Sequence, residues 1–171
     1  MCRKILCRQK NTWPHCKPNL HLMQSLFDKP VLQEVSHRLQ LLQKNAQPQW
    51  GKMNASQMLA HCNKAFAVPL SERPLPRMWL GYLVGWMVKT SLYNDNPWKK
   101  NLPTASSFVV KDERDFEEEK NRLQELINEF YSKGPDKAGL YPHPMFGKFT
   151  DTQWGQAMYK HLDHHLRQFG V

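Results

Sequence analysis

The chain has 171 residues, 40% of them hydrophobic, with six Trp and eight Phe. This composition excludes an intrinsically disordered protein, and the length favours one domain with a substantial core. The formal net charge is +9, but residues 1–22 hold five bases and no acid, which leaves 19 bases against 15 acids in residues 23–171. Because that body carries only +4 and no basic stripe, we do not expect a nucleic-acid partner.

Residues 1–22 show no hydrophobic periodicity, and they hold three of the four cysteines. We expect them to be a disordered basic tail, or translated sequence upstream of a real start at Met23. They lack the apolar run of a signal peptide, and the cysteines do not form a disulfide framework. The longest apolar stretch, residues 78–88, is too short to span a bilayer. We therefore expect a soluble cytoplasmic protein without a membrane partner.

Helical periodicity predicts four long helices. Apolar residues recur three and four positions apart in residues 31–44, 55–68, 113–133 and 151–169. Asn54 and Thr150 each precede a Gln by three positions, which predicts capping boxes at the second and last helices. Asp112 is the expected cap of the third long helix, and Leu39 and Leu126 are expected core residues.

Residues 78–93 are apolar nearly all round and include two glycines. This pattern predicts a short hydrophobic helix, buried or lid-like, although periodicity alone leaves a strand open. A long irregular loop follows, and loops of that length are often functional. The predicted fold class is all-α, a helical bundle.

The last helix places His161 and His165 four residues apart on its apolar face, about 6 Å apart at Cβ. A buried imidazole without a partner costs a few kcal/mol, which either a divalent metal ion or hydrogen bonds to backbone carbonyls would remove. His164 lies about 60° to the side, where it is either a fourth imidazole or a residue that is solvated or supports the others.

His61 lies at the edge of the apolar face of the second helix and offers a third imidazole. Three protein ligands with an open position are typical of catalytic zinc sites, and imidazole also suits nickel, iron and copper. The alternative, that all three are hydrogen-bonded core histidines, stays open on spacing alone. Cys62 is expected to be a small buried hydrophobic residue.

Two long motifs resemble those of a known family. They are W-G-K-M-N-A-S-Q-M-L-A-H, ending at His61, and H-P-M-F-G-K-F-T-D-T-Q-W-G, starting at His143, followed by H-L-D-H-H-L-R-Q-F from His161 to Phe169. These segments resemble an uncharacterised bacterial branch of the DinB-like superfamily, and the resemblance covers residues 23–171.

The resemblance implies a four-helix bundle with a long crossover and a metal site formed by His61, His161 and His165, and the extra His164 leaves the ligand set at that end open. Relatives in that superfamily include transferases and isomerases that use low-molecular-weight thiols such as bacillithiol or mycothiol, and many form homodimers. The expected function is that of a divalent-metal-dependent enzyme, with zinc or nickel, that transfers a thiol to an electrophilic small molecule. The alternative is a non-catalytic metal- or ligand-binding bundle.

Overall fold

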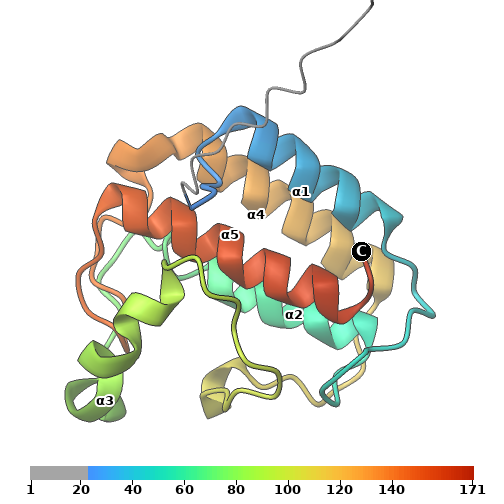
Figure 1. Cartoon of the computed structure of the whole chain (residues 1–171), viewed down its shortest axis with the longest axis horizontal. Coiled ribbons are helices and arrows are strands. Elements are labelled where there is room, and N and C mark those ends of the chain that lie inside the picture. The colour runs from blue at the N-terminus through green and yellow to red at the C-terminus, as the bar shows by residue number, and fades with distance from the viewer. Residues whose placement is uncertain (1–22) are drawn as a thin grey trace, which may run out of the picture.

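The computed structural model of the protein describes residues 23–171, apart from the side chain of Val84, and this part of the chain is mostly helical (Figure 1). Its elements in order are α1 (Lys29–Leu41), α2 (Ala55–Phe66), α3 (Trp79–Lys89), the 3-10 turns η1 (Thr90–Leu92) and η2 (Ser106–Phe108), α4 (Phe116–Lys137) and α5 (Asp151–Gln168). Between residues 23 and 171 there is no β-strand, only an isolated bridge from His143 to Gly147. The all-α prediction is confirmed for this part, and the expectation for residues 1–22 lies outside it.

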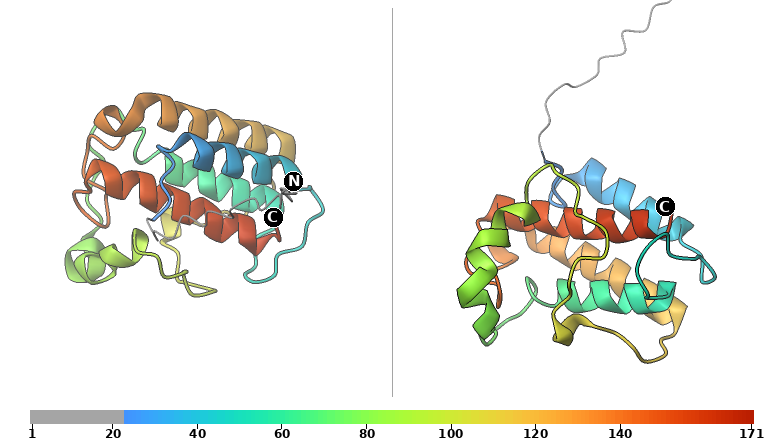
Figure 2. Two further views of the ribbon diagram at one scale, coloured as in Figure 1. Left: turned by 45° about the horizontal axis from the view of Figure 1, so that its top comes forward. Right: turned by 60° about the horizontal axis from the view of Figure 1, so that its bottom comes forward.

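The helices α1, α2, α4 and α5 lie side by side around one hydrophobic core (Figures 1 and 2). Phe130 of α4 is at its centre, with its ring stacked 4.7 Å from that of Phe27 and edge-on, 5.8 Å, to that of Phe66. Leu39 and Leu126 are 1% and 5% exposed, so both predicted core positions are confirmed.

Side-chain caps fix the starts of the two helices that carry the histidines. Asn54 accepts a hydrogen bond from the backbone N–H of Gln57 at 2.9 Å, and the Gln57 side chain accepts one from the N–H of Asn54 at 3.1 Å. Thr150 and Gln153 make the same reciprocal pair at the start of α5. Each cap contributes about 1 kcal/mol, and both predicted capping boxes are confirmed.

The predicted cap of the third long helix is wrong. The carboxylate of Asp112 pairs with Arg114 at 2.7 Å, and the helix begins three residues later than expected. Asp115 is its cap and accepts a hydrogen bond from the N–H of Glu118 at 2.8 Å. The sequence offered two aspartates in this stretch, and only the second is followed by an uninterrupted helical stripe.

Residues 79–89 form a helix rather than a strand. Of the two expectations for this helix, buried or lid-like, the first is wrong. Gly81 and Gly85 lie directly against the backbone of Met145, so the inward face of α3 consists of glycines. The large side chains of Trp79 and Trp86 therefore point away and are 73% and 72% exposed. No helix within residues 23–171 is long and apolar enough to cross a bilayer.

Candidate metal centre

The three histidines singled out by the sequence converge in the structure. His61 comes from α2, and His161 and His165 come from α5, and one ring nitrogen of each lies within 4.8 Å of those of the other two. The Nε2 atoms of His61 and His161 are 3.0 Å apart. Three imidazole nitrogens bound to a tetrahedral zinc ion would lie about 3.4 Å apart, so small side-chain rotations suffice to accommodate an ion.

The ring of His61 is oriented by the crossover between α3 and α4. Its Nδ1 lies 3.0 Å from the backbone carbonyl oxygen of Phe108, the last residue of η2. Lys64, one turn further along α2, donates to the carbonyls of Ser107 and Val109 at 3.3 Å and so fixes this turn against α2. Because a carbonyl only accepts, Nδ1 of His61 carries the proton and Nε2 has a free lone pair.

A second chain of hydrogen bonds orients His165. Its Nδ1 lies 2.9 Å from Oε1 of Gln168, while Nε2 of Gln168 donates to the carbonyl of Trp50 at 2.6 Å. The Trp50 carbonyl thereby fixes the orientation of the amide, so that Gln168 offers its oxygen to the histidine. Nδ1 of His165 is therefore the protonated atom, and its Nε2 has the lone pair.

His161 differs from the other two histidines. Since Nε2 of His61 has a lone pair, the 3.0 Å contact between the two rings requires Nε2 of His161 to donate. To act as a ligand through that atom, His161 must move its proton to Nδ1. Within residues 23–171, Nδ1 of His161 has no protein hydrogen-bond partner, and the residue is partly exposed.

The surroundings keep the cluster neutral. Burial lowers the pKa of His165 to about 3, and the neighbouring His61 acts in the same direction. Burial also lowers the pKa of His161 well below its ordinary value, with further lowering by His165 and His61. The pKa of His61 is lowered by burial, although its hydrogen bond to Phe108 opposes the shift. Neutral imidazole is the form that binds metal ions.

His164 lies beside the cluster rather than in it. Its ring is 5.2 Å from that of His165 and contacts two tryptophans, Trp50 at 5.4 Å and Trp98 at 5.5 Å. It is not among the three residues whose ligand atoms converge. Burial lowers the pKa of His164, and Asp163 opposes this shift.

Trp98 covers the cluster from the long loop after α3. Its ring lies 5.7 Å from that of His161, and its Nε1 donates to the carbonyl of Ser91 at 2.8 Å. The buried ammonium of Lys160 donates to the same carbonyl at 2.7 Å and to two oxygens of Asn94. Lys160 thus ties the loop to α5 one residue before His161, and this anchoring positions Trp98.

Three other residues with ligating or nucleophilic side chains lie outside the cluster, namely His143, Cys62 and His37. Nδ1 of His143 accepts hydrogen bonds from the backbone N–H groups of Met145 and Phe146, and burial lowers its pKa to about 4. Cys62 is fully buried, and burial raises the pKa of its thiol, which leaves it a core residue and not a nucleophile. His37 is exposed on α1.

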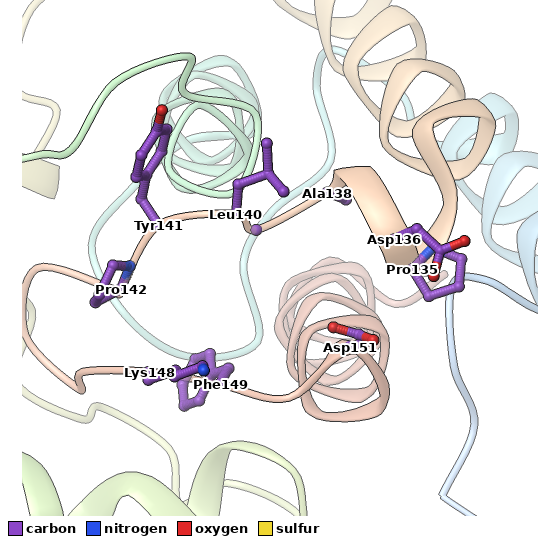
Figure 3. Close-up of a pocket in the computed structure, with 10 residues that line it drawn as sticks. Pro135, Asp136, Ala138, Leu140, Tyr141, Pro142, Lys148, Phe149 and Asp151 are labelled. Atoms are coloured by element: carbon purple, nitrogen blue, oxygen red, sulfur yellow. The ribbon is translucent and has the colours of Figure 1, made fainter.

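A hollow of about 350 Å³ lies elsewhere, where the segment after α4 passes the start of α5 (Figure 3). Tyr141, Phe149 and Asp151 are among its lining residues, and none of the clustered histidines lines it. Its lining offers no imidazole or thiolate, so the chemistry of this protein is better sought at the histidines.

Sequence reasoning found the three histidines and missed the residues that orient them. Gln168 and Lys160 have ordinary helical positions, and the carbonyl of Phe108 is a backbone atom that no sequence pattern marks. The signal that could have found Trp98 was the length of its loop, since long irregular loops are often functional.

Comparison with known protein families gives a match over nearly all of the described residues. A family model described as "Protein of unknown function (DUF1569)" matches residues 22–170. No curated protein and no solved structure matches the chain.

Proposed function

Because the chain belongs to the DUF1569 family, whose description gives no function, we propose a function from the histidine cluster itself. We propose that His61, His161 and His165 hold a divalent metal ion, zinc or nickel, and that the protein is a metal-dependent enzyme. Its substrate would be an electrophilic small molecule, and its co-substrate a low-molecular-weight thiol.

The observation that carries this proposal is the convergence of three ring nitrogens within 4.8 Å, together with the protonated Nδ1 atoms of His61 and His165. Metal-binding histidines usually donate their second ring N–H to a carbonyl or carboxylate, which points the lone pair of the other nitrogen at the ion. Phe108 and Gln168 supply such acceptors here. Histidines placed only to fill a core would not need three converging ring nitrogens, two of which, on His61 and His165, have a free lone pair.

A bound divalent cation would supply Lewis-acid chemistry, lowering the pKa of a water or thiol at its open position. The protein residues supply the rest. The rings of Trp50 and Trp98 limit the access of water, and Lys160 keeps Trp98 in position. His164, half-buried between these rings and close to His165, is placed to exchange a proton with a group bound at the cluster.

The resemblance to the DinB-like superfamily favours S-transfer among the reactions open to such a site. With it we propose that α1, α2, α4 and α5 form a four-helix bundle of the DinB-like type, with residues 67–115 as its long crossover. The superfamily also makes a homodimer a reasonable assembly. A nucleic-acid partner fits poorly with a body that carries only +4.

The second candidate is a non-catalytic bundle in which the ion ties α2 to α5. The observation that favours it is the closeness of Trp98 to the cluster, since a ring 5.7 Å from that of His161 narrows the space for a substrate. The two candidates differ in one respect, namely whether a small molecule reaches the ion.

Metal analysis of protein purified without a histidine tag, followed by cobalt substitution, separates the candidates. We expect about one equivalent of zinc or nickel per chain. If the site is open, adding a small thiol to the cobalt form produces a new sulfur-to-cobalt absorption band, which a closed structural site does not show. Protein that neither contains nor takes up a metal ion would refute both candidates.

A further inference from the structure

The short helix α3 carries an unusual amount of exposed hydrophobic surface. Trp79, Tyr82 and Trp86 are 73%, 66% and 72% exposed, and most of the side chains of Leu83 and Met87 are exposed as well. These five residues define the apolar face of α3. At about 100° per residue they lie within an arc of about 140°.

This exposure follows from how α3 is attached. The side of α3 that carries Gly81 and Gly85 lies against the backbone of Met145, where there is no room for a side chain. The large side chains of α3 therefore lie on its other sides. The N–H of Met78 also donates to the carbonyl of Pro144 at 3.0 Å, at the start of the helix. α3 stands apart from the other helices at one corner of the molecule in each view (Figures 1 and 2).

The apolar face is as large as the largest apolar patch found on a typical monomer. A Trp or Tyr side chain has about 150–250 Å² of surface, so the three aromatic residues alone leave about 300–500 Å² in contact with water. The largest apolar patch on a typical monomer is about 300–600 Å², and such patches often mark binding sites. Leu83 and Met87 enlarge the area further, which indicates a surface that something covers.

The surroundings of this face are basic. Residues 69–100 hold five Lys and Arg and two acids, and none of the acids is in α3 itself. Arg77 donates to the carbonyl of His143 and Lys89 to that of Lys148, so both side chains are bound beside the helix by uncharged acceptors. In the described part of the chain, neither forms an ion pair with a carboxylate.

We propose that the apolar face of α3 docks on the anionic surface of a lipid bilayer, with the helix lying in the plane of the interface. Trp and Tyr are enriched at this depth of a bilayer, and Lys and Arg beside an apolar helical face attract anionic lipid headgroups. The expectation of no membrane partner rested on the length needed to span a bilayer, which a helix lying on the surface does not need.

A second copy of the chain could cover the apolar face of α3 with an equally large apolar face, but its charges would not be complementary. Whether two α3 helices pair parallel or antiparallel, Arg77 and Lys89 of one copy meet the same basic residues of the other. No acid in α3 is available to neutralise them. An anionic lipid surface is complementary where a second copy would be repulsive.

Vesicle co-sedimentation of the full chain tests this proposal. We expect binding to vesicles of phosphatidylcholine with about 30% phosphatidylglycerol, and much weaker binding to phosphatidylcholine alone. The variant W79S/W86S should lower the partition coefficient by about tenfold or more, because it removes the two most exposed aromatic rings. Tryptophan fluorescence of the wild type should shift to shorter wavelength with anionic vesicles, and this shift should vanish in the variant.

Two controls keep the result specific. L41S/L140S changes two exposed leucines away from α3, 51% and 65% exposed, and should bind like the wild type. W79S/W86S keeps every charge of the chain, including those of residues 1–22, so unchanged binding by this variant would overturn the proposal. A wild type that does not bind anionic vesicles would also overturn it. A wild-type protein with about twice the 20.2 kDa mass of one chain in solution, together with a monomeric W79S/W86S variant, would overturn it as well.

Discussion

Mild acid should destabilise the metal-free protein through its buried histidines. The unfolded chain takes up a proton at His165 below about pH 6.5, whereas burial lowers the pKa of this group in the folded protein to about 3. Between these values the unfolded state binds more protons than the folded state. The contribution of His165 to the free energy of unfolding is therefore fully present above pH 6.5, and it is lost as the pH falls toward 3.

The size of the effect follows from the two pKa values. Between pH 7.5 and 5.5, protonation of one such histidine in the unfolded state lowers the free energy of unfolding by about 1.4 kcal/mol. His143, half-buried and with its pKa lowered to about 4, acts in the same direction, so the two together remove about 2–3 kcal/mol. His61 and His161 add to the loss, because burial lowers their pKa values as well.

Urea unfolding in the presence of a chelator, at pH 7.5 and 5.5, measures this loss. The midpoint should fall by about 1 M between the two values. H165Q should reduce the pH dependence, whereas H37Q, at an exposed position on α1, should leave it unchanged. Equal midpoints of the wild type at both pH values would show that the histidines are not held neutral by burial, and would refute the reasoning.

Three further predictions concern the core, the attachment of α3 and the orientation of the site. Leu126→Ala should lower the free energy of unfolding by about 2–5 kcal/mol in urea titrations, and a loss no larger than that of the exposed control Leu41→Ala would contradict the packing. Gly85→Leu should release α3 from the Met145 backbone, so that the backbone amides of α3 exchange faster with solvent in hydrogen-exchange measurements. Unchanged exchange rates would contradict the close approach. Gln168→Leu should weaken zinc binding about 10–100-fold by calorimetry, because His165 loses its acceptor, and wild-type affinity would exclude this role.

Much of the fold could be predicted from the sequence because its signals are local. The capping boxes at Asn54 and Thr150 mark where α2 and α5 begin, and the buried stripe through Leu126 follows from helical periodicity alone. The cap of α4 was misplaced because Asp112 and Asp115 are both good capping residues. In the structure Asp112 pairs with Arg114, and Asp115 caps the helix.

Long-range contacts explain what the sequence could not predict. Side-chain hydrophobicity indicated that residues 78–93 form a helix that is either buried or lid-like, and the glycine face of α3 against Met145 excludes the buried alternative. The histidines were predicted because two of them share one helix face. Their orientation was not predicted, because it depends on contacts between residues far apart in the chain. The Phe108 carbonyl lies 47 positions from His61, and the Trp50 carbonyl that orients Gln168 lies 118 positions from it.

Zinc titration by calorimetry of tag-free protein tests the central claim most directly, namely that His61, His161 and His165 form one metal site. The wild type should bind about one zinc ion, and His61→Ala, His161→Ala and His165→Ala should each weaken binding by about 100-fold or more. His164→Ala should have a much smaller effect, since its ring lies outside the converging group. A wild type that binds no metal ion, or an equal loss for His164→Ala and His161→Ala, would contradict the proposed site.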